Sequence, residues 1–337
     1  MRHEDIVTYS RNVFLPVSNI CRNRCAYCGF RGRPNNGGWL LTTSEVLSMA
    51  WVGKLCGCTE ALITTGERPD FFLSVKERLR EWGFRDFTHY VEHLCKSLLR
   101  LDMLPHVNLG VLSKHELRRL KRWCASMGLM LECATPLPAH AHSPGKTPAF
   151  RLATIEAAGE LRIPFTTGIL VGVGESERDR MFSLHLIREL HDRYGHIQEV
   201  IVQPFEPKPN TPMHAWKPPA WRAVLRTVRA ATRILPGVPI QFPPNLLHLY
   251  GFFERRVREL LRAGVRDFGG ISPITPDFVN PRAPWPSAER LRAAILRAGF
   301  QPRERLPLYP CYVERRWMSA EVKRVVDRIS DEAGYRN

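Results

Sequence analysis

The chain has 337 residues, of which 44% are hydrophobic, and its formal net charge at pH 7 is +16. A chain of this length can bury the core of one α/β barrel or of two smaller domains without disulfide bonds. No apolar run approaches the roughly 20 residues that cross a bilayer, and the charged start at residues 1–5 does not resemble a signal peptide. We therefore expect a cytoplasmic protein outside the membrane, with its nine cysteines kept reduced.

Short β-rich segments alternate with longer helical patterns along the chain. Strands are predicted at residues 12–17, 60–64, 106–109, 129–133, 165–170, 199–203, 238–242 and 265–268. Helices are predicted at residues 44–55, 84–101, 114–126, 148–161, 176–194, 219–235 and 245–263. This alternation indicates an α/β fold with a parallel sheet, and its size suits a (β/α)8 barrel of the TIM type. We expect the barrel over residues 1–283 and a C-terminal helical extension packed on it over residues 284–337.

The first predicted strand is followed by Cys21-Arg-Asn-Arg-Cys25-Ala-Tyr27-Cys28. Three thiolates at this spacing can bind three irons of a 4Fe-4S cluster, which leaves the fourth iron without a protein ligand. An open iron can chelate S-adenosylmethionine (SAM) and release a 5′-deoxyadenosyl radical from it. Because the chemistry of a TIM-type barrel gathers on the loops after the strands, this loop lies where a cofactor is expected.

Later strand ends offer polar groups that suit SAM. Gly66, after the second strand, permits close backbone approach, and Glu67 can accept a hydrogen bond from the methionine ammonium. Glu132, at the end of the fourth strand, can bind ribose hydroxyls, and Arg151, on the next helix, can bind the carboxylate. Ordinary salt bridges are the alternative, between Glu67 and Arg68 and between helix and strand for the other two residues.

A polar loop at residues 140–146 follows the fourth predicted strand. We expect it to face the cavity above the cluster, where it would bind substrate or transfer protons. His140 and Ser143 are its candidate catalytic residues. The alternative is an exposed loop whose histidines have no function.

Together these segments resemble the radical-SAM deazaflavin synthases, most closely subunit 1 of 7,8-didemethyl-8-hydroxy-5-deazariboflavin (FO) synthase. The resemblance spans residues 9–280 and rests on residues 9–16, 21–31, 65–69, 127–132, 140–146, 165–172 and 241–246. Residues 65–67 resemble the Gly-Gly-Glu segment of radical-SAM enzymes, with Thr65 in place of the first glycine. Tyr27 matches the family's aromatic position near the adenine of SAM.

The resemblance implies a carbon-nitrogen lyase of deazaflavin coenzyme biosynthesis. Its substrate would be 5-amino-5-(4-hydroxybenzyl)-6-(D-ribitylimino)-5,6-dihydrouracil, hereafter the adduct. The enzyme would cyclise the adduct to FO and release ammonia, while SAM becomes methionine and 5′-deoxyadenosine. It also implies two partners: FO synthase subunit 2, which supplies the adduct, and a protein that donates electrons.

Several alternatives stay open. The chain could be subunit 2, or another radical-SAM enzyme that acts on a tyrosine-derived substrate. A zinc site would need a second ligand pair, and Cys56-Gly-Cys58 has an unsuitable spacing. A non-enzyme alternative is an RNA-binding protein with a structural cluster, which the basic composition would suit. Because the basic residues mix with apolar ones at helical spacing, we favour solvated helix faces and expect no nucleic-acid partner.

Overall fold

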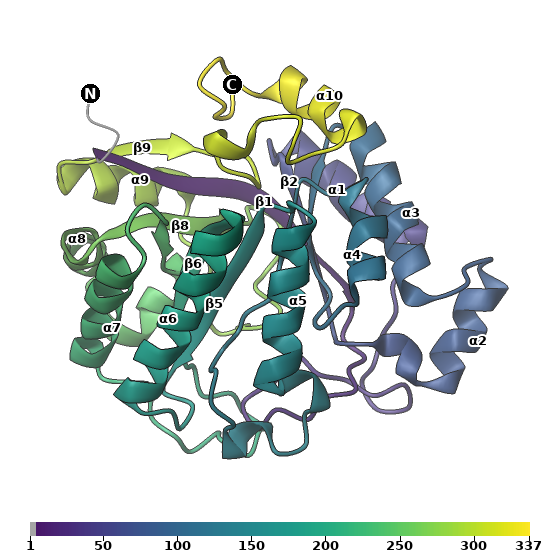
Figure 1. Cartoon of the computed structure of the whole chain (residues 1–337), viewed down its shortest axis with the longest axis horizontal. Coiled ribbons are helices and arrows are strands. Elements are labelled where there is room, and N and C mark those ends of the chain that lie inside the picture. Colours follow the sequence, from purple (N-terminus) through teal and green to yellow (C-terminus); the bar gives the residue numbers. More distant parts are fainter. Residues whose placement is uncertain (1–4) are drawn as a thin grey trace.

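In the computed structural model, which describes residues 5–337, strands and helices alternate around a closed parallel barrel (Figure 1). The strands are β1 (Ile6–Ser18), β2 (Glu60–Thr65), β3 (Leu104–Asn108), β4 (Ser126–Gly128), β5 (Phe165–Val171), β6 (Ile197–Pro204), β7 (Ile240–Gln241), β8 (Val265–Ile271) and β9 (Gln301–Glu304). The α-helices are α1 (Thr43–Leu55), α2 (Leu73–Glu81), α3 (Phe87–Arg100), α4 (Lys114–Lys121), α5 (Pro148–Glu160), α6 (Glu177–Tyr194), α7 (Trp221–Ile234), α8 (Phe253–Ala263), α9 (Ala288–Arg297) and α10 (Ala320–Ile329). Within the described range, no helix is both long and apolar enough to cross a membrane.

The long strand β1 closes the barrel. The sheet runs in the order β2-β3-β4-β5-β6-β7-β8-β1-β9, with a further pairing between β2 and β1. The second half of β1 pairs with β2, in a register that sets Asn12 beside Glu60, and its first half pairs with both β8 and β9. Since every pairing is parallel, the carboxyl ends of the strands meet at one rim. This topology confirms the predicted (β/α)8 barrel and adds β9 beside it.

The fourth strand lies earlier in the chain than predicted. The predicted helix at 114–126 ends at Lys121, and β4 occupies Ser126–Gly128 instead of 129–133. This strand of 3 residues is buried but contains no β-branched residue, so its sequence does not indicate a strand. Within the predicted segment, Glu132 has a φ of +66° and forms only an isolated parallel bridge to Ile169 of β5.

Helix α2 and strand β9 were not predicted. Helix α2 buries only Val75 and Leu79, so its apolar periodicity is weak. Strand β9 contains Pro302 and charged residues. These residues occur in edge strands, but they do not give the alternating apolar pattern by which a strand is predicted. The predicted helix at 245–263 is split, because Gly251 adopts a φ of +62° between a 3-10 turn (Pro244–Tyr250) and α8.

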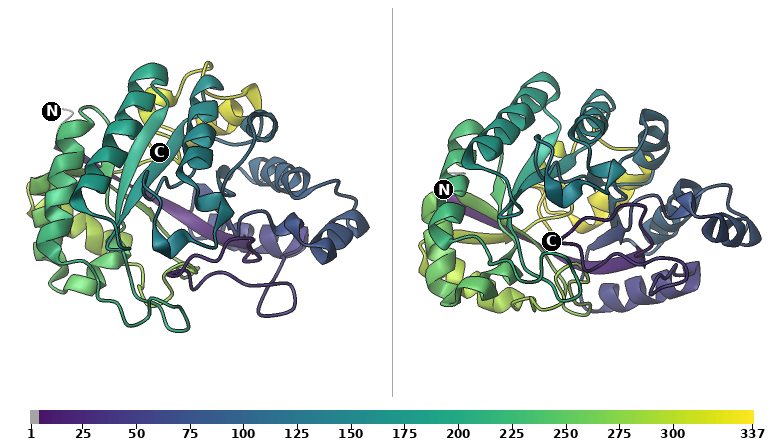
Figure 2. Two further views of the ribbon diagram at one scale, coloured as in Figure 1. Left: turned by 60° about the horizontal axis from the view of Figure 1, so that its bottom comes forward. Right: turned by 90° about the horizontal axis from the view of Figure 1, so that it is seen from below.

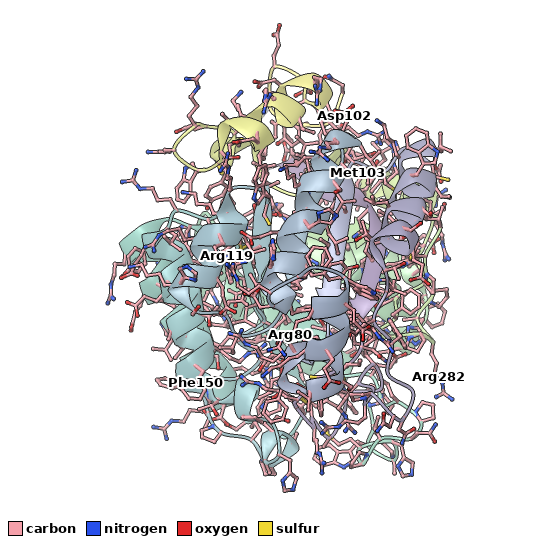
Figure 3. All side chains as sticks on the ribbon, turned by 90° about the vertical axis from the view of Figure 1, so that its right-hand side faces the viewer. Arg80, Asp102, Met103, Arg119, Phe150 and Arg282 are labelled. Atoms are coloured by element: carbon pink, nitrogen blue, oxygen red, sulfur yellow. The ribbon has the colours of Figure 1, made fainter. Side chains whose placement is uncertain are left out.

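The C-terminal segment covers the barrel end opposite the rim. Figure 1 shows α10 at the top of the barrel, and Figure 3 places Asp102 and Met103 beside this segment, with Phe150 and Arg282 toward the other end. A separate apolar cluster fills the contact, made by Leu99, Leu104, Ala125, Leu306, Leu308, Tyr309, Tyr312, Trp317, Met318, Val322, Val325 and Val326. The predicted boundary between a barrel and an extension at residue 284 stays a prediction.

Arg305 is the centre of a buried ion-pair network inside the barrel. Its guanidinium donates to Asp267 of β8 at 2.7 Å and to Glu199 of β6 at 2.9 Å. Thr166 and Tyr309 donate to the same Glu199 carboxylate at 2.8 and 3.1 Å. All of these groups are buried, and the one guanidinium is shared between two carboxyl groups.

We predict that Arg305→Met lowers the free energy of unfolding by about 3–5 kcal/mol, because it removes the cationic partner of the buried Asp267 carboxylate and of Glu199 where Glu199 is ionised. Arg328→Met is the matched control, since Arg328 pairs with Asp102 at an exposed site and should cost less than about 1 kcal/mol. Urea unfolding followed by circular dichroism measures both changes. Equal effects of the two substitutions would contradict the role of Arg305.

The same network predicts a pH dependence of stability. Burial raises the pKa of Glu199 from 4.5 to about 7, against the opposing effect of Arg305 and with a further rise from Asp267. Between these values the folded protein keeps a proton that the unfolded chain has released. The free energy of unfolding therefore falls as the pH rises through this range, and the contribution of Glu199 is fully present only below about pH 4.5.

We predict that Glu199→Gln flattens this dependence, because glutamine does not titrate. The loss of stability of the wild-type protein between about pH 5.5 and 8 should exceed that of the variant by on the order of 2 kcal/mol. Urea unfolding at both pH values measures the difference. Parallel pH profiles of the two proteins would show that Glu199 is ionised throughout.

Candidate active site at the carboxyl ends of the strands

A cavity of about 380 Å³ extends from the rim into the barrel. The right-hand view of Figure 2 shows this end of the molecule, where the loop after β1 crosses the barrel. Cys21, Cys25 and Cys28 line the cavity together with side chains from the loops after β2, β3, β4, β6 and β7. The rule that places chemistry at the carboxyl ends of barrel strands is therefore met.

Backbone hydrogen bonds clamp the cysteine loop between its neighbours. Arg22 donates its N–H to the carbonyl of Glu67 at 3.0 Å, in the loop after β2. Arg24 and Ala26 donate to the carbonyls of His142 and Ala139 at 3.1 and 2.9 Å, in the loop after β4. The position of the thiols thus depends on contacts between three loops.

The donor set fits a cluster better than a single ion. The backbone N–H of Glu67 donates to the Sγ of Cys21 at 3.2 Å, and the hydroxyl of Ser143 donates to the Sγ of Cys25 at 3.3 Å. Among residues 5–337, no three His, Cys, Asp or Glu side chains gather closely enough to hold one metal ion. Each thiolate of a 4Fe-4S cluster binds a different iron, so the three sulfurs need not converge on one point.

Glu67 is an ion-pair partner of the cysteine loop. Its Oε1 accepts from Arg22 at 2.9 Å, and its Oε2 accepts from the N–H of Val111 at 3.2 Å. The carboxylate is packed so closely that a Cβ at Gly145 would lie 1.5 Å from Oε1. The alternative pairing with Arg68 is wrong, because Arg68 binds Glu116 of α4 instead.

Gly66 permits a close approach of the backbone, while its expected place beside SAM stays a prediction. Its N–H donates to the carbonyl of Ser18 at 2.7 Å, and a Cβ at this position would lie 2.2 Å from the carbonyl oxygen of Ile20. The approaching group is the backbone that leads into the cysteine loop. A side chain at position 66 would push the two loops apart.

Glu132 gathers four partners around one buried carboxylate. Tyr27 from the cysteine loop and Lys146 from the loop after β4 both donate to it. His140 and Arg151 lie 3.1 and 3.4 Å from its oxygens. Burial alone would raise the pKa of Glu132, but Lys146 and Arg151 outweigh this effect and hold the pKa well below its usual range. The carboxylate is therefore a fixed negative charge.

Arg151 forms the salt bridge to Glu132 that was considered as the alternative. It also donates to the backbone carbonyls of Met130 and Gly145 at 2.6 and 2.9 Å, and it lies 3.8 Å from Glu67. The structure thus brings Arg151, Glu67 and Glu132 into one network, which borders the cavity. Their contact with SAM stays a prediction.

Only part of the polar loop at 140–146 faces the cavity. Lys146 lines the cavity, whereas His140 and Ser143 line a separate surface pocket with Arg24. The reason is that this loop pairs with the cysteine loop, which turns the Ser143 hydroxyl toward Cys25 and the imidazole toward the Tyr27 hydroxyl, at 2.9 Å. The expectation that these two side chains face the cavity is wrong.

A second polar wall of the cavity was not predicted from the sequence. Glu206, in the loop after β6, lies 3.0 Å from His248, and Lys208 donates to the carbonyl of Glu206 at 3.2 Å. Asn245, after β7, donates to Asp277, after β8, at 2.9 Å. Polar residues that directly follow predicted barrel strands were the available signal.

The floor of the cavity is also polar. Glu60, His106, Glu199 and Arg305 line it, and Ser10 donates to Glu60 at 2.6 Å. Burial, aided by Arg305, lowers the pKa of His106 to about 3, so this imidazole is neutral near pH 7. A neutral imidazole can donate one hydrogen bond and accept another.

Similar proteins point to one family. The Radical SAM superfamily model matches residues 15–187. The chain is 47% identical to 7,8-didemethyl-8-hydroxy-5-deazariboflavin synthase of Methanopyrus kandleri, over 98% of this chain and 99% of that protein. It is also 47% identical to the synthase of the same name from Archaeoglobus fulgidus, over 98% of each protein.

Solved structures share the fold at low sequence identity. The FeFe-hydrogenase maturase HydG from Carboxydothermus hydrogenoformans aligns with a TM-score of 0.67 and 22% identity, over 90% of this chain and 68% of that chain. Methylornithine synthase (PylB) aligns with a TM-score of 0.67 and 18% identity, over 88% of this chain and 84% of that chain. The fold, the cysteine-lined cavity and the near full-length relatives agree, and the chain belongs to the FO synthase family of the radical SAM superfamily.

Proposed function

We propose that the protein is the cyclising subunit of FO synthase, subunit 1. It converts the adduct to FO as a carbon-nitrogen lyase, with release of ammonia, and works in the cytoplasm. The observation that carries this proposal is the 47% identity to FO synthases along nearly the whole chain. The chain has a single CxxxCxxC motif and contains no Gly-Gly-Leu-His-Pro segment of the kind associated with subunit 2, which favours subunit 1.

The cofactors of the protein are a 4Fe-4S cluster and SAM, as in the radical SAM superfamily. Cys21, Cys25 and Cys28 would hold the cluster. When bound, the cluster and SAM together supply the radical that removes a hydrogen atom from the adduct. FO synthase subunit 2 would supply the adduct, and a carrier protein would supply electrons.

The residues near the cysteines would orient SAM. Gly66, Glu67, Glu132 and Arg151 line the cavity beside the thiols, and Tyr27 joins them through its hydrogen bond to Glu132. Because ion pairs already fix these side chains, binding would cost little additional side-chain entropy. Their charges would also attract the zwitterionic methionine part of SAM.

His140 and Ser143 would act as positioning residues. Ser143 donates to the Sγ of Cys25 at 3.3 Å, and His140 lies 2.9 Å from the Tyr27 hydroxyl. Since neither residue lines the cavity, they influence the reaction through the cysteine loop. This role replaces the direct proton transfer considered from the sequence.

The floor of the cavity would bind the ribityl and uracil parts of the adduct. A polyol and a uracil ring carry many donors and acceptors, and a buried site must match them. Glu60, His106, Asn108 and Gln241 provide such groups deep in the barrel. Burial there keeps water away from the reacting centre.

We predict that Cys21→Ala, Cys25→Ala and Cys28→Ala each abolish the cleavage of SAM, because each removes one ligand of the cluster. The control is Cys56→Ala, since Cys56 is exposed and remote from the cavity lining. Iron content, visible absorption and 5′-deoxyadenosine formation measure the effect in anaerobically reconstituted protein. If all three variants cleave SAM at the wild-type rate, the ligand assignment is wrong.

We predict that reconstituted protein with SAM and reductant forms fluorescent FO from the preformed adduct, but not from tyrosine with 5-amino-6-(D-ribitylamino)uracil. Chromatography of FO and 5′-deoxyadenosine from the two mixtures makes the comparison. Adduct formation from tyrosine, without FO, would identify subunit 2. If SAM is cleaved in neither mixture, the protein acts on a different tyrosine-derived substrate.

A further inference from the structure

Three arginines in or directly after the cysteine loop have no carboxylate partner among residues 5–337. Arg24 lies within the cysteine motif and is exposed, and Arg31 and Arg33 follow the motif and are half-buried. Within residues 5–337, none of them forms an ion pair, whereas Arg22 in the same loop pairs with Glu67 at 2.9 Å. Most of the half-buried arginines elsewhere, such as Arg119 with Glu92, have a carboxylate neighbour. Among the described residues, these three positive charges therefore have no carboxylate neighbour of their own.

These guanidinium groups also act on one another. Burial and then the charges of Arg24 and Arg31 lower the pKa of Arg33, against the opposing effect of Cys21, as expected for three arginines close to one another in the chain. The Nε of Arg31 is buried and has no hydrogen-bond partner. Like charges at close range raise the free energy of the folded protein unless an anion is present. The arrangement is costly for the isolated chain.

A rigid hairpin maintains this arrangement. Arg33 and Asn36 exchange backbone hydrogen bonds of 3.1 and 2.9 Å, and the Arg33 guanidinium lies 5.1 Å from the ring centroid of Phe72. A Cβ at Gly38 would lie 2.2 Å from the carbonyl oxygen of Arg33, so the hairpin is tightly closed. The local backbone therefore holds Arg33 near the other two arginines in spite of their repulsion.

The three side chains extend from the cavity to the outer surface. Arg31 lines the cavity that the cysteines line, and Arg24 lines the surface pocket formed with residues 140–147. Arg33 lines neither the cavity nor the surface pocket. A small anion in the cavity could meet Arg31, but it could not reach all three arginines. A large partner with an acidic surface could.

We propose that Arg24, Arg31 and Arg33 form a docking surface for an acidic one-electron carrier protein, which reduces the cluster on the adjacent cysteines. This inference rests on the cluster site of the proposed function. One electron leaves the reduced carrier and enters the oxidised cluster, whose charge changes from 2+ to 1+, and no bond forms or breaks. Electron transfer needs a short path, and the cysteine loop is the part of the surface nearest the cluster. Complementary charge also increases the rate at which the carrier finds this site.

The test compares two double variants of the reconstituted holoenzyme with equal changes of charge. Arg24→Glu/Arg33→Glu reverses the proposed surface without changing a residue that lines the cavity. Arg229→Glu/Arg233→Glu is the control, because both residues are exposed on α7, on the outside of the barrel (Figure 1). The probe is an acidic plant-type 2Fe-2S ferredoxin, in its reduced form for turnover. Its affinity for the holoenzyme is measured by calorimetry, and SAM cleavage is driven either by this ferredoxin or by saturating dithionite.

At low salt, the Arg24→Glu/Arg33→Glu variant should bind ferredoxin at least about tenfold more weakly and show a similar loss of ferredoxin-driven SAM cleavage. Added salt should weaken ferredoxin binding to the wild-type protein and to the control, but have little effect on the variant. The ratio of ferredoxin-driven to dithionite-driven SAM cleavage should fall in the Arg24→Glu/Arg33→Glu variant and keep its wild-type value in the control. Unchanged ferredoxin affinity, or an equal loss with dithionite, would overturn the proposal.

Two further outcomes distinguish docking of an electron carrier from RNA binding and from an error in the proposed substrate. If the variant lost affinity for an RNA oligonucleotide but not for ferredoxin, the arginines would form a nucleic-acid surface and the proposal would fail. If ferredoxin reduced the wild-type cluster, seen by electron paramagnetic resonance, with the expected loss in the variant, docking would stand even without formation of FO. In that case only the proposed substrate would be wrong.

Discussion

The buried carboxylate of Glu132 is the interaction on which the geometry of the site depends. It binds Tyr27 of the cysteine loop, His140 and Lys146 of the loop after β4, and Arg151 of α5. To reach them, the residue adopts a φ of +66°, a conformation that costs a non-glycine residue about 1–2 kcal/mol. This strain is offset by contacts with three separate segments of the chain. Glu132 thereby fixes the cysteine loop relative to the barrel.

The two ends of the barrel use buried charges for different purposes. At the rim, Glu67 and Glu132 hold basic side chains that belong to loops and to the start of a helix. At the floor, Arg305 holds carboxylates that belong to strands, and so closes the barrel below the cavity. Between these ends lies a space of about 380 Å³ with polar walls. Its depth separates the predicted cluster site from the predicted site of the ribityl chain.

Much of the fold could be predicted because strands and helices have local sequence signals. Seven of the eight barrel strands overlap their predicted positions, and the cysteine loop follows β1 as expected. The short strand β4 could not be predicted, because its three residues carry no strand pattern and are buried only by the neighbouring strands. The orientation of His140 was predicted wrongly for a similar reason. It depends on Tyr27, which lies more than a hundred residues earlier in the chain.

The site residues also differ in whether a local sequence pattern or contacts between distant segments place them. The thiol spacing of Cys21, Cys25 and Cys28 is a local pattern, and the chemistry it indicates agrees with the family to which the chain belongs. The pairing of Glu67 with Arg22, rather than with Arg68, depends on how two loops meet. The polar wall around Glu206 and Asn245 is likewise assembled from loops after different strands. These contacts depend on which loops the barrel topology brings together, and no local sequence motif indicates them.

The central claim is that the three thiols hold one cluster with an iron that remains open to SAM. Electron paramagnetic resonance of the reduced, reconstituted protein, with and without SAM, tests it most directly. We predict one 4Fe-4S cluster per chain, with a signal that changes when SAM binds to the open iron. A signal that SAM leaves unchanged would indicate a fully ligated cluster and would contradict this account.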